Sequence, residues 1–399
     1  MPVIARYAAV TLPPLALLIL AGTAWGGFAW IALAWLTLVA ALADRLLAPP
    51  TAPASNEDTQ PWSDALSVGL ALGHMLLLIS TCAAVTSGTL SLGQTLALLF
   101  ATASFFGQVS HPNAHELIHR HNTALKALGA AVYTTVGFGH HVSAHRLVHH
   151  RHVGTEQDPS TPRPGESFWA YLPRAWRGTF EAGIIAEVDR LEHKGRGPNH
   201  ITNPYWLWLG GALVTAVVII TNAGLAGFVP LVLLWVLTGA QILMSDYVQH
   251  YGLQRLILPN GRTEPVAAHH SWNAPSGFSS YLMMNAPAHS EHHMHPDRPY
   301  DRLDPRATAP TLPFSMPVMA IIATVPAAWR RMMDKRALSV MEAAQAAHLA
   351  PTLTRSNAAP ARTSSATPTS GPGTTPAQTP LSDDTDTELL LQSVRAATR

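Results

Sequence analysis

Six long apolar runs, almost free of charged side chains, constrain the fold of this chain more than any other feature. They cover about residues 7–24, 27–47, 65–87, 91–109, 204–222 and 226–247. A helix of about 20 apolar residues is long enough to cross the hydrocarbon core of a bilayer. The sequence therefore predicts an all-α integral membrane protein with about six transmembrane helices.

The connections between these runs predict the membrane topology. Short turns such as "AWGG" and "TSGTLS" join the runs within each pair, and long polar stretches follow the second, fourth and sixth runs. With an even number of spans, the long stretches and both termini share one face. The stretch 110–203 carries ten Lys and Arg residues, whereas the short turns carry almost none. The positive-inside rule places the polar face in the cytoplasm.

The segments outside the six apolar runs predict how the remainder of the chain is organised. Only Arg6 precedes the first run, no clear cleavage site follows it, and another span comes at once, so we expect a retained anchor rather than a signal peptide. Residues 124–139 are apolar but short, and we expect a buried or re-entrant helix there. We expect a membrane-embedded domain over 1–340 and a disordered tail, rich in Pro, Thr, Ser and Ala, over 350–399.

Histidines gather in three short motifs that all follow the spans on the predicted cytoplasmic face. The chain has 21 histidines, and its single cysteine, Cys82, excludes a disulfide within the chain, a thiolate iron–sulfur centre and a four-cysteine zinc site. The motifs are "HELIH", "HRLVHH" and "HSEHH", and a single histidine lies in "DYVQHYGL". The histidines concerned are His115, His119, His145, His149, His150, His250, His289, His292 and His293.

The number and spacing of these histidines indicate two bound metal ions. His115 and His119 are four residues apart, as are His145 and His149, so each pair falls on one face of a helix. Nine imidazoles are too many for one ion, which takes about four to six ligands. Imidazole suits iron, copper, zinc and nickel alike, so ligand type alone does not choose the metal.

The motifs resemble the histidine boxes of the integral-membrane diiron superfamily, which includes fatty-acid desaturases, fatty hydroxylases, and alkane and xylene monooxygenases. They are most similar to those of the membrane alkane hydroxylases. "HELIHR" looks like the first box, "HRLVHHRHVGTEQDP" the second, and "HHSWN" with "HSEHHMHPDRPYDRL" the third and its lead-in. "DYVQHYGL" resembles the signature that separates these hydroxylases from desaturases. The resemblance covers about residues 5–335.

Three positions depart from the family pattern. Ala144 and Gln249 stand where the family usually has Glu, and "NAPAHSEHH" lacks the usual Leu-Gln-Arg lead-in. No proposed histidine ligand is lost. The missing carboxylates would orient imidazoles, so their loss bears on rate and substrate range more than on reaction class.

The resemblance implies a monooxygenase in the inner membrane of a bacterium, with its active site and both termini on the cytoplasmic side. Two non-haem iron ions, held by the nine histidines, would use O2 to hydroxylate the terminal C–H bond of a linear alkane or similar hydrophobic substrate drawn from the bilayer. No catalytic residue beyond the metal ligands is implied. We expect membrane lipids as neighbours and no nucleic-acid partner.

Electrons have to come from a partner protein, because the chain lacks a flavin or nucleotide fingerprint and iron–sulfur cysteines. The resemblance implies rubredoxin or a ferredoxin-type donor with its reductase. A basic docking face for an acidic donor and anchoring to anionic lipid headgroups account equally well for the candidate arginines. These are Arg146, Arg151, Arg174, Arg177, Arg330 and Arg331.

Other residues are candidates for supporting roles. Asp158, Asp246 and Glu291 are candidate partners of ligand imidazole N–H groups, with Glu156 as a weaker one. Trp30 and Trp35 are substrate-channel candidates, although interfacial packing explains either tryptophan alone.

Three other functions are weighed against this interpretation. "HELIH" is also the H-E-x-x-H pattern of zinc metalloproteases, which would leave seven clustered histidines unexplained. A fatty-acyl desaturase or hydroxylase of the same superfamily fits the box spacings, but "DYVQHYGL" argues against a desaturase. A metal transporter would need polar residues within the spans, which are nearly free of ionisable groups.

Overall fold

The described part of the chain is built from helices. A computed structural model describes residues 3–46, 59–275, 277–304 and 309–356. Within these ranges, β structure is limited to two isolated bridges, Ile257–Thr263 and Asn273–Thr311. The expected all-α class is confirmed.

Six helices are long and apolar enough to cross a membrane, as the sequence predicts. Two of them carry a π-helical turn within the span, and one begins with a 3₁₀ turn. They are α1 (Val3–Thr23), α2–η1–α3 (Phe28–Leu46), α4 (Gln60–Thr86), α5–η2–α6 (Leu92–His119), α11 (Tyr205–Ala223) and η4–α12 (Leu225–His250).

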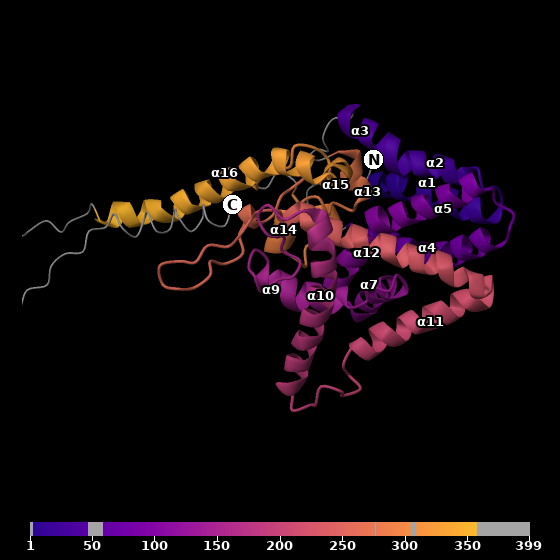
Figure 1. Cartoon of the computed structure of the whole chain (residues 1–399), viewed down its shortest axis with the longest axis horizontal. Coiled ribbons are helices and arrows are strands. Elements are labelled where there is room, and N and C mark those ends of the chain that lie inside the picture. The colour runs from indigo at the N-terminus through magenta and orange to yellow at the C-terminus, as the bar shows by residue number, and fades with distance from the viewer. Residues whose placement is uncertain (1–2, 47–58, 276, 305–308, 357–399) are drawn as a thin grey trace, which may run out of the picture. The chain divides into compact units, whose positions relative to one another are not determined.

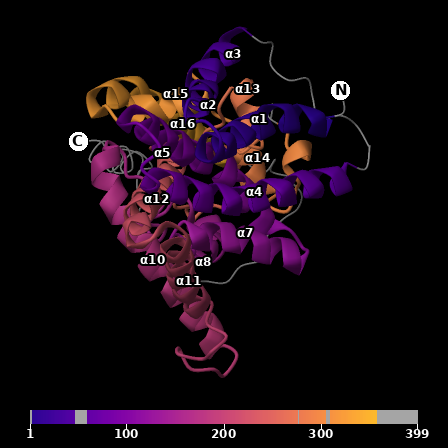
Figure 2. The same cartoon turned by 90° about the vertical axis from the view of Figure 1, so that its right-hand side faces the viewer.

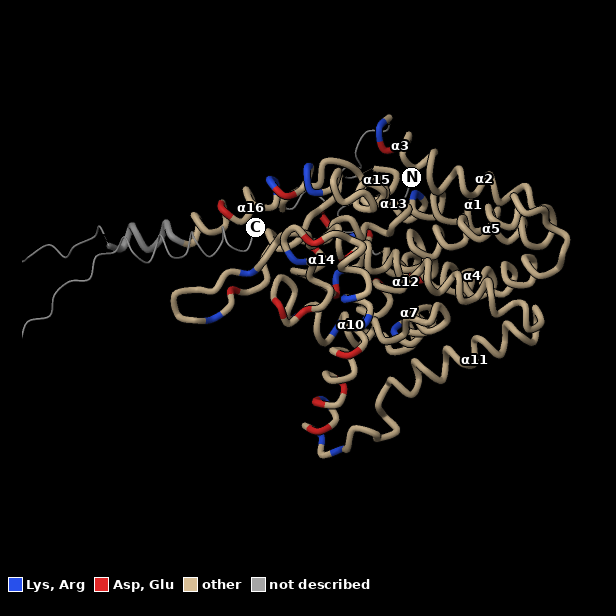
Figure 3. Tube along the Cα trace, viewed as in Figure 1, with Lys and Arg blue, Asp and Glu red and all other residues tan. Residues whose placement is uncertain are grey.

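The helices form a bundle whose outer surface is apolar. α1 packs on α2, α4 and α5, and α12 packs on α4 and α5, while α11 lies along the edge of the bundle against α4 and α7 (Figures 1 and 2). Leu213 and Val217 of α11 are more than half exposed. Charged residues are absent from α2, α5 and α11 and gather around α10 and the connecting segments (Figure 3). This distribution suits a bundle whose flank faces lipid.

The polar segments between the spans carry shorter helices. These are α7 (Thr123–Thr135), α8 (His141–Ser143), η3 (Ala144–His149), α9 (His150–His152), α10 (Phe168–Glu192), η5 (Ala268–His270), α13 (Phe278–Leu282), α14 (His289–Met294), η6 (Tyr300–Arg302), α15 (Met316–Ala323) and α16 (Pro326–Ser356). α7 is the short helix expected near 124–139, and it packs on α6.

Helix α10 was not predicted from the sequence. Its buried residues Tyr171, Ala175, Thr179 and Gly183 recur every four positions, which is a helical pattern within a polar segment. α10 packs against α12, α8 and η3. A Cβ on Gly183 would lie 2.5 Å from the Tyr205 hydroxyl and 3.2 Å from a backbone nitrogen of η3, so this close approach requires glycine.

The chain divides into two units, residues 1–337 and 338–399, and the histidine motifs all belong to the first. α16 continues to Ser356. The remainder of the expected disordered tail, 357–399, lies outside the described residues.

Candidate metal centre

The nine histidines come together in two adjacent groups. The five-His centre consists of His115, His119, His145, His150 and His292, and the four-His centre of His149, His250, His289 and His293. Within each group, every side chain offers a nitrogen that lies within 4.8 Å of all the others. Each of the nine residues singled out as a candidate ligand is therefore placed in one of the two groups.

The imidazoles meet nitrogen to nitrogen at the spacing of ligands around one ion. In the five-His centre, His145 Nε2 lies 2.7 Å from His115 Nε2 and 2.9 Å from His150 Nε2. In the four-His centre, His289 Nε2 lies 2.9 Å from His250 Nε2 and 3.1 Å from His293 Nε2. Two metal–nitrogen bonds of about 2.1 Å at right angles would place their nitrogens about 3 Å apart. Both donor sets thus fit a cation.

Two helices each deliver a pair of histidines by ordinary α-helical spacing. His115 and His119 lie one turn apart on α6 and enter the same centre, and His289 and His293 do so on α14. His250 is the last residue of α12 rather than a residue beyond its end. Because α6 and α12 end two membrane-spanning helices, the bundle itself positions these ligands.

The second motif departs from the predicted spacing. His145 and His149, expected on one helix face, point to different centres, whereas His145 and His150 share the five-His centre. The reason is that Ala144–His149 forms a π-helix, η3. Hydrogen bonds in a π-helix close from residue i to i+5, so residues five apart come onto one face. His149 is thereby directed to the four-His centre.

Burial keeps four of the candidate ligand imidazoles neutral. Burial first, and then neighbouring imidazoles, lower the pKa values of His145, His292 and His293 well below their ordinary range. The same causes lower the pKa of His150 to about 3. A neutral imidazole retains the lone pair that a metal ion requires.

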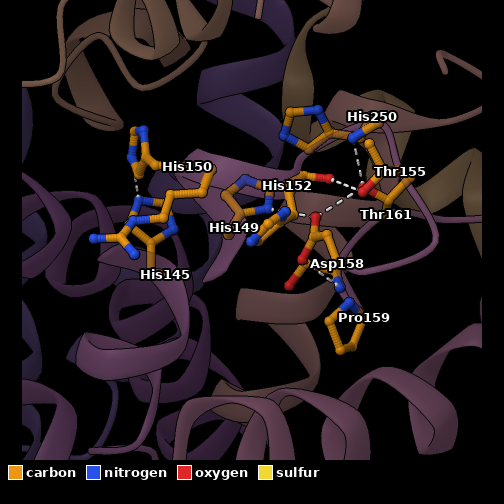
Figure 4. Close-up of polar contacts among 12 residues, drawn as sticks. His145, His149, His150, His152, Thr155, Asp158, Pro159, Thr161 and His250 are labelled. Carbon is orange, nitrogen blue, oxygen red and sulfur yellow. Dashed lines mark hydrogen bonds and ion pairs between the residues drawn. The ribbon is translucent and has the colours of Figure 1, made fainter. Parts of the chain in front are cut away.

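Asp158 is the partner of one ligand ring, as the sequence suggested. Its Oδ2 accepts hydrogen bonds from His149 Nδ1 at 2.8 Å and from the Thr161 hydroxyl at 2.7 Å, and its Oδ1 accepts one from the Ser160 backbone N–H at 3.0 Å (Figure 4). Burial raises the pKa of Asp158, but the His149 ring and these hydrogen bonds outweigh it and hold the pKa below its ordinary value. The arrangement leaves His149 Nε2 toward the four-His centre.

A second ligand ring is fixed by residues that sequence reasoning missed. His250 Nδ1 donates to the backbone carbonyl of His270 at 3.1 Å. His270 is itself held at both ring nitrogens, because the Ala267 N–H donates to Nδ1 at 2.9 Å and Nε2 lies 2.9 Å from Glu264 Oε1. Glu264, His269 and His270 also satisfy metal-ligand spacing. However, the acceptor role of His270 Nδ1 requires a proton on Nε2, so this trio serves as a scaffold for His250.

The other carboxylates considered as partners of the imidazoles, Asp246, Glu291 and Glu156, lie in environments different from that of Asp158. Asp246 is buried and faces the cavity between the centres, and Glu291 forms an ion pair with Arg298. Glu156 is exposed. His152, which lies outside both groups, accepts a hydrogen bond at its backbone carbonyl from Thr155 (Figure 4).

Glu116, the general base of a hypothetical zinc protease, is occupied elsewhere. Its carboxylate pairs with Arg120 Nε at 3.1 Å, and Arg120 also pairs with Asp64 at 3.2 Å. His115 and His119 belong to a five-imidazole centre. This arrangement does not provide a carboxylate to activate water on an H-E-x-x-H metal.

A small cavity, with room for about one water molecule, adjoins both centres. It is lined by His115 and His145 of one centre, by His289 of the other, and by Asp246 and Gln249. Gln249 accepts a hydrogen bond from Ser245 at 2.9 Å and donates to the Ala286 carbonyl at 3.0 Å. Its amide thus links α12 to the segment before α14, a role that requires a donor as well as an acceptor.

The two tryptophan candidates lie outside this cavity. Trp30 is 52% exposed on α2. Trp35 Nε1 donates to the Val10 carbonyl at 3.1 Å, and the ring packs edge-on against Phe278. Neither residue lines the cavities described here.

The sequence of the chain is similar to those of several known monooxygenases. The chain is 36% identical over 234 residues to alkane 1-monooxygenase 1 of Alcanivorax borkumensis. It is 32% identical over 229 residues to alkane 1-monooxygenase of Ectopseudomonas oleovorans. Each alignment covers 56% of this chain and 55% of the relative. The chain is 25% identical over 261 residues to the xylene/toluene monooxygenase hydroxylase component of Pseudomonas putida, covering 63% of this chain and 67% of that protein. The chain thus spans about 55% of the length of the first two relatives.

A family model described as fatty acid desaturase matches residues 90–321, which is more than half of the chain. The matched region contains all nine histidines of the two centres. The chain therefore belongs to the fatty acid desaturase family.

Proposed function

We propose that the two histidine centres hold a pair of iron ions and that the protein is a membrane-bound monooxygenase of hydrocarbons. The observation that carries the proposal is the convergence of nine buried or half-buried imidazoles into two donor sets, in each of which the ligand nitrogens lie within 4.8 Å of one another and the closest pairs are 2.7–3.2 Å apart. Imidazole donors suit iron. The similarity to alkane 1-monooxygenases supports iron over the other metals that imidazole binds.

The reaction proposed is the hydroxylation of a terminal C–H bond of a linear alkane. One oxygen atom of O2 enters the C–H bond, and two electrons and two protons reduce the other atom to water. Bound iron supplies the redox chemistry with O2 that side chains lack. The names of the relatives, alkane 1-monooxygenase and xylene/toluene monooxygenase, support a hydrophobic substrate that enters from the bilayer.

The protein's own contribution is positioning and shielding. Asp158 and the His270 carbonyl orient two candidate ligand rings, and most of the nine histidine side chains are buried. Burial of the centres would keep bulk water from a substrate that reaches the ions. Trp30 and Trp35 remain proposed chain-length determinants, and a Trp35→Ser variant with an unchanged chain-length profile would remove Trp35 from that role.

A fatty-acyl desaturase or hydroxylase is the second candidate, and the description of the matching family favours it. Metal counting and product analysis separate the possibilities. The purified chain is analysed for iron and zinc, then given an electron donor, O2 and either a medium-chain alkane or a fatty acyl lipid. Two irons and a primary alcohol support the proposal. A new double bond supports a desaturase, and one zinc with no oxidation supports a protease.

We propose a multi-pass location in a bacterial inner membrane with the histidine motifs on the cytoplasmic side, because the positive charges follow the long connections. Rubredoxin or a ferredoxin-type protein is the proposed donor. Arg146 and Arg151 are exposed beside the second motif, whereas Arg174 and Arg177 are paired with Glu166 and Glu181. Reversing the charge of Arg146 should slow reduction by an acidic donor in a salt-dependent way.

A further inference from the structure

Two further buried histidines lie next to the five-His centre without belonging to either donor set. His111 precedes His115 by four residues, and His141 precedes His145 by four. The His141 ring stacks on the His145 ring with centroids 5.1 Å apart, and the centroids of His111 and His115 are 6.1 Å apart. The proposed function leaves both residues without a role.

Tyr133 of α7 joins these two histidines. Its ring centroid lies 4.8 Å from that of His141 and 5.8 Å from that of His111, and its side chain is 1% exposed. Ring contacts therefore lead from Tyr133 through His141 to His145, a candidate ligand of the five-His centre. Each step is about the thickness of one side chain, a separation across which an electron passes readily.

The Tyr133 hydroxyl is hydrogen-bonded to a base. It lies 2.8 Å from His111 Nδ1 and 3.4 Å from the His111 backbone carbonyl. Because the contact with nitrogen is much the shorter, the single phenolic proton is donated to Nδ1. The neutral His111 ring then carries its own proton on Nε2, and Nδ1 is free to take up the phenolic proton.

Other buried tyrosines lack this combination of a base and a ring contact with the histidine cluster. The Tyr205 hydroxyl donates to the Phe180 backbone carbonyl at 2.8 Å, and a carbonyl oxygen does not take up a proton. The Tyr251 hydroxyl donates to the Asp334 carboxylate at 2.6 Å. Among the described residues, however, the ring contacts of Tyr251 are with Tyr247 and Trp329 and not with a histidine.

The chemistry of a phenol explains why this combination matters. A phenol that loses an electron becomes a strong acid, so the electron leaves easily only when the proton can leave with it. An unpaired charge is costly away from water, and transfer of the proton to an adjacent base leaves the oxidised phenol neutral. Tyr133 has such a base at hydrogen-bond distance and a route for its electron toward the five-His centre.

We propose that Tyr133 is a redox-active residue that reduces the O2-derived oxidant of the monooxygenase when no substrate is bound. One electron passes from the Tyr133 ring to the oxidant, and the phenolic proton moves to His111 Nδ1, which leaves a neutral phenoxyl radical. An electron from the partner protein and the proton held by His111 restore the phenol. Two such cycles, with two protons from water, reduce the unused oxygen atom to water. This inference rests on the proposed function.

Electron paramagnetic resonance of the full-length, iron-loaded protein in lipid nanodiscs tests the proposal. The protein is reduced chemically, freed of excess reductant, mixed with O2 in the absence of substrate and frozen. Wild type is compared with Tyr133→Phe and with His111→Asn, in which an amide oxygen accepts a hydrogen bond near the position of Nδ1 but takes up no proton. The matched control is Tyr205→Phe, which removes a buried hydroxyl bonded to a carbonyl.

We expect a tyrosyl radical in the wild type, identified by the narrowing of its hyperfine pattern when the tyrosine rings are deuterated. The radical should be lost in Tyr133→Phe, reduced in yield in His111→Asn and retained in Tyr205→Phe, with each yield expressed per bound iron. An iron-loaded wild type without a tyrosyl radical would overturn the proposal, as would an undiminished radical in Tyr133→Phe.

A second measurement tests whether the residue protects the centres. Each protein is reduced and exposed to O2 repeatedly without substrate, and mass spectrometry follows the addition of oxygen to the peptides that carry the nine histidines. Tyr133→Phe should accumulate this damage faster than the wild type and Tyr205→Phe, and equal rates would contradict the protective role.

The two proposals fail in different ways. A wild type that binds no iron would overturn the proposed function and this inference with it. An iron-loaded wild type that hydroxylates an alkane but forms no radical on Tyr133 would overturn this inference alone.

Discussion

Replacing Asp158 by Ala should empty the four-His centre while leaving the five-His centre filled. The Asp158 carboxylate is buried and accepts three hydrogen bonds, from His149 Nδ1, Thr161 Oγ1 and the Ser160 N–H, at 2.7–3.0 Å. Without it, His149 loses the acceptor that fixes its orientation and keeps the proton on Nδ1. Loss of such a partner weakens metal binding about 10- to 100-fold, which corresponds to about 1.4–2.7 kcal/mol.

The assay is iron content per chain after equilibration with graded concentrations of a chelator. Wild-type protein should lose its two ions at similar chelator concentrations, and Asp158→Ala should lose one of them at a concentration 10- to 100-fold lower. Thermal unfolding of the metal-free proteins measures how much folding stability the substitution removes. Three donors left unpaired should lower stability by about 3 kcal/mol.

The matched control is Asp297→Ala. Asp297 is largely exposed and lies 3.5 Å from His121, outside both centres. This variant should keep both ions and full stability. If Asp158→Ala retains both ions with wild-type affinity, the reasoning that this carboxylate orients His149 is wrong.

Three further predictions concern pH, the family departure at Gln249 and the packing of α10. Burial lowers the pKa of His149, but the Asp158 carboxylate outweighs burial and raises this pKa above its ordinary value, whereas the pKa of His150 is lowered to about 3. Because protons compete with a metal ion for an imidazole, metal content measured against pH should show the four-His centre emptying at a higher pH than the five-His centre. Gln249→Glu replaces the donor to the Ala286 carbonyl with a carboxylate beside Asp246, so thermal unfolding should show that the free energy of unfolding falls by about 1–3 kcal/mol. An unchanged melting temperature would refute this prediction. Gly183→Ala should displace η3 or Tyr205 and cost about 1–3 kcal/mol in the same assay. The control is Gly210→Ala, which also replaces a helical glycine but meets nothing within 4 Å.

The membrane-spanning helices were predictable because hydrophobicity is a property of each segment alone. The predicted runs at 204–222 and 226–247 correspond to Tyr205–Ala223 and Leu225–His250. The largest difference is at the fourth span, which was expected to end near residue 109 and continues as one helix to His119. Polar residues from His111 onward hid this extension, because their side chains are buried against other segments rather than solvated.

The membership of the histidine set was also predictable, but its division between two centres was not. Spacing of three or four residues correctly groups His115 with His119, yet it misgroups His145 with His149. A π-helical turn separates them, and it packs against α10, a contact that composition does not reveal. Likewise, the scaffold of Glu264 and His270 acts on His250 through a backbone carbonyl, so no side-chain pattern in the sequence indicates it.

The π-helical turn at Ala144–His149 makes the length of this segment as critical as its residues. One residue more or fewer there would rotate every following side chain by about 100°, the angular step of an α-helix. His150 would then leave the five-His centre that it shares with His145, although every histidine was still present. Deletion of a single non-histidine residue from this segment should therefore still disrupt the five-His centre.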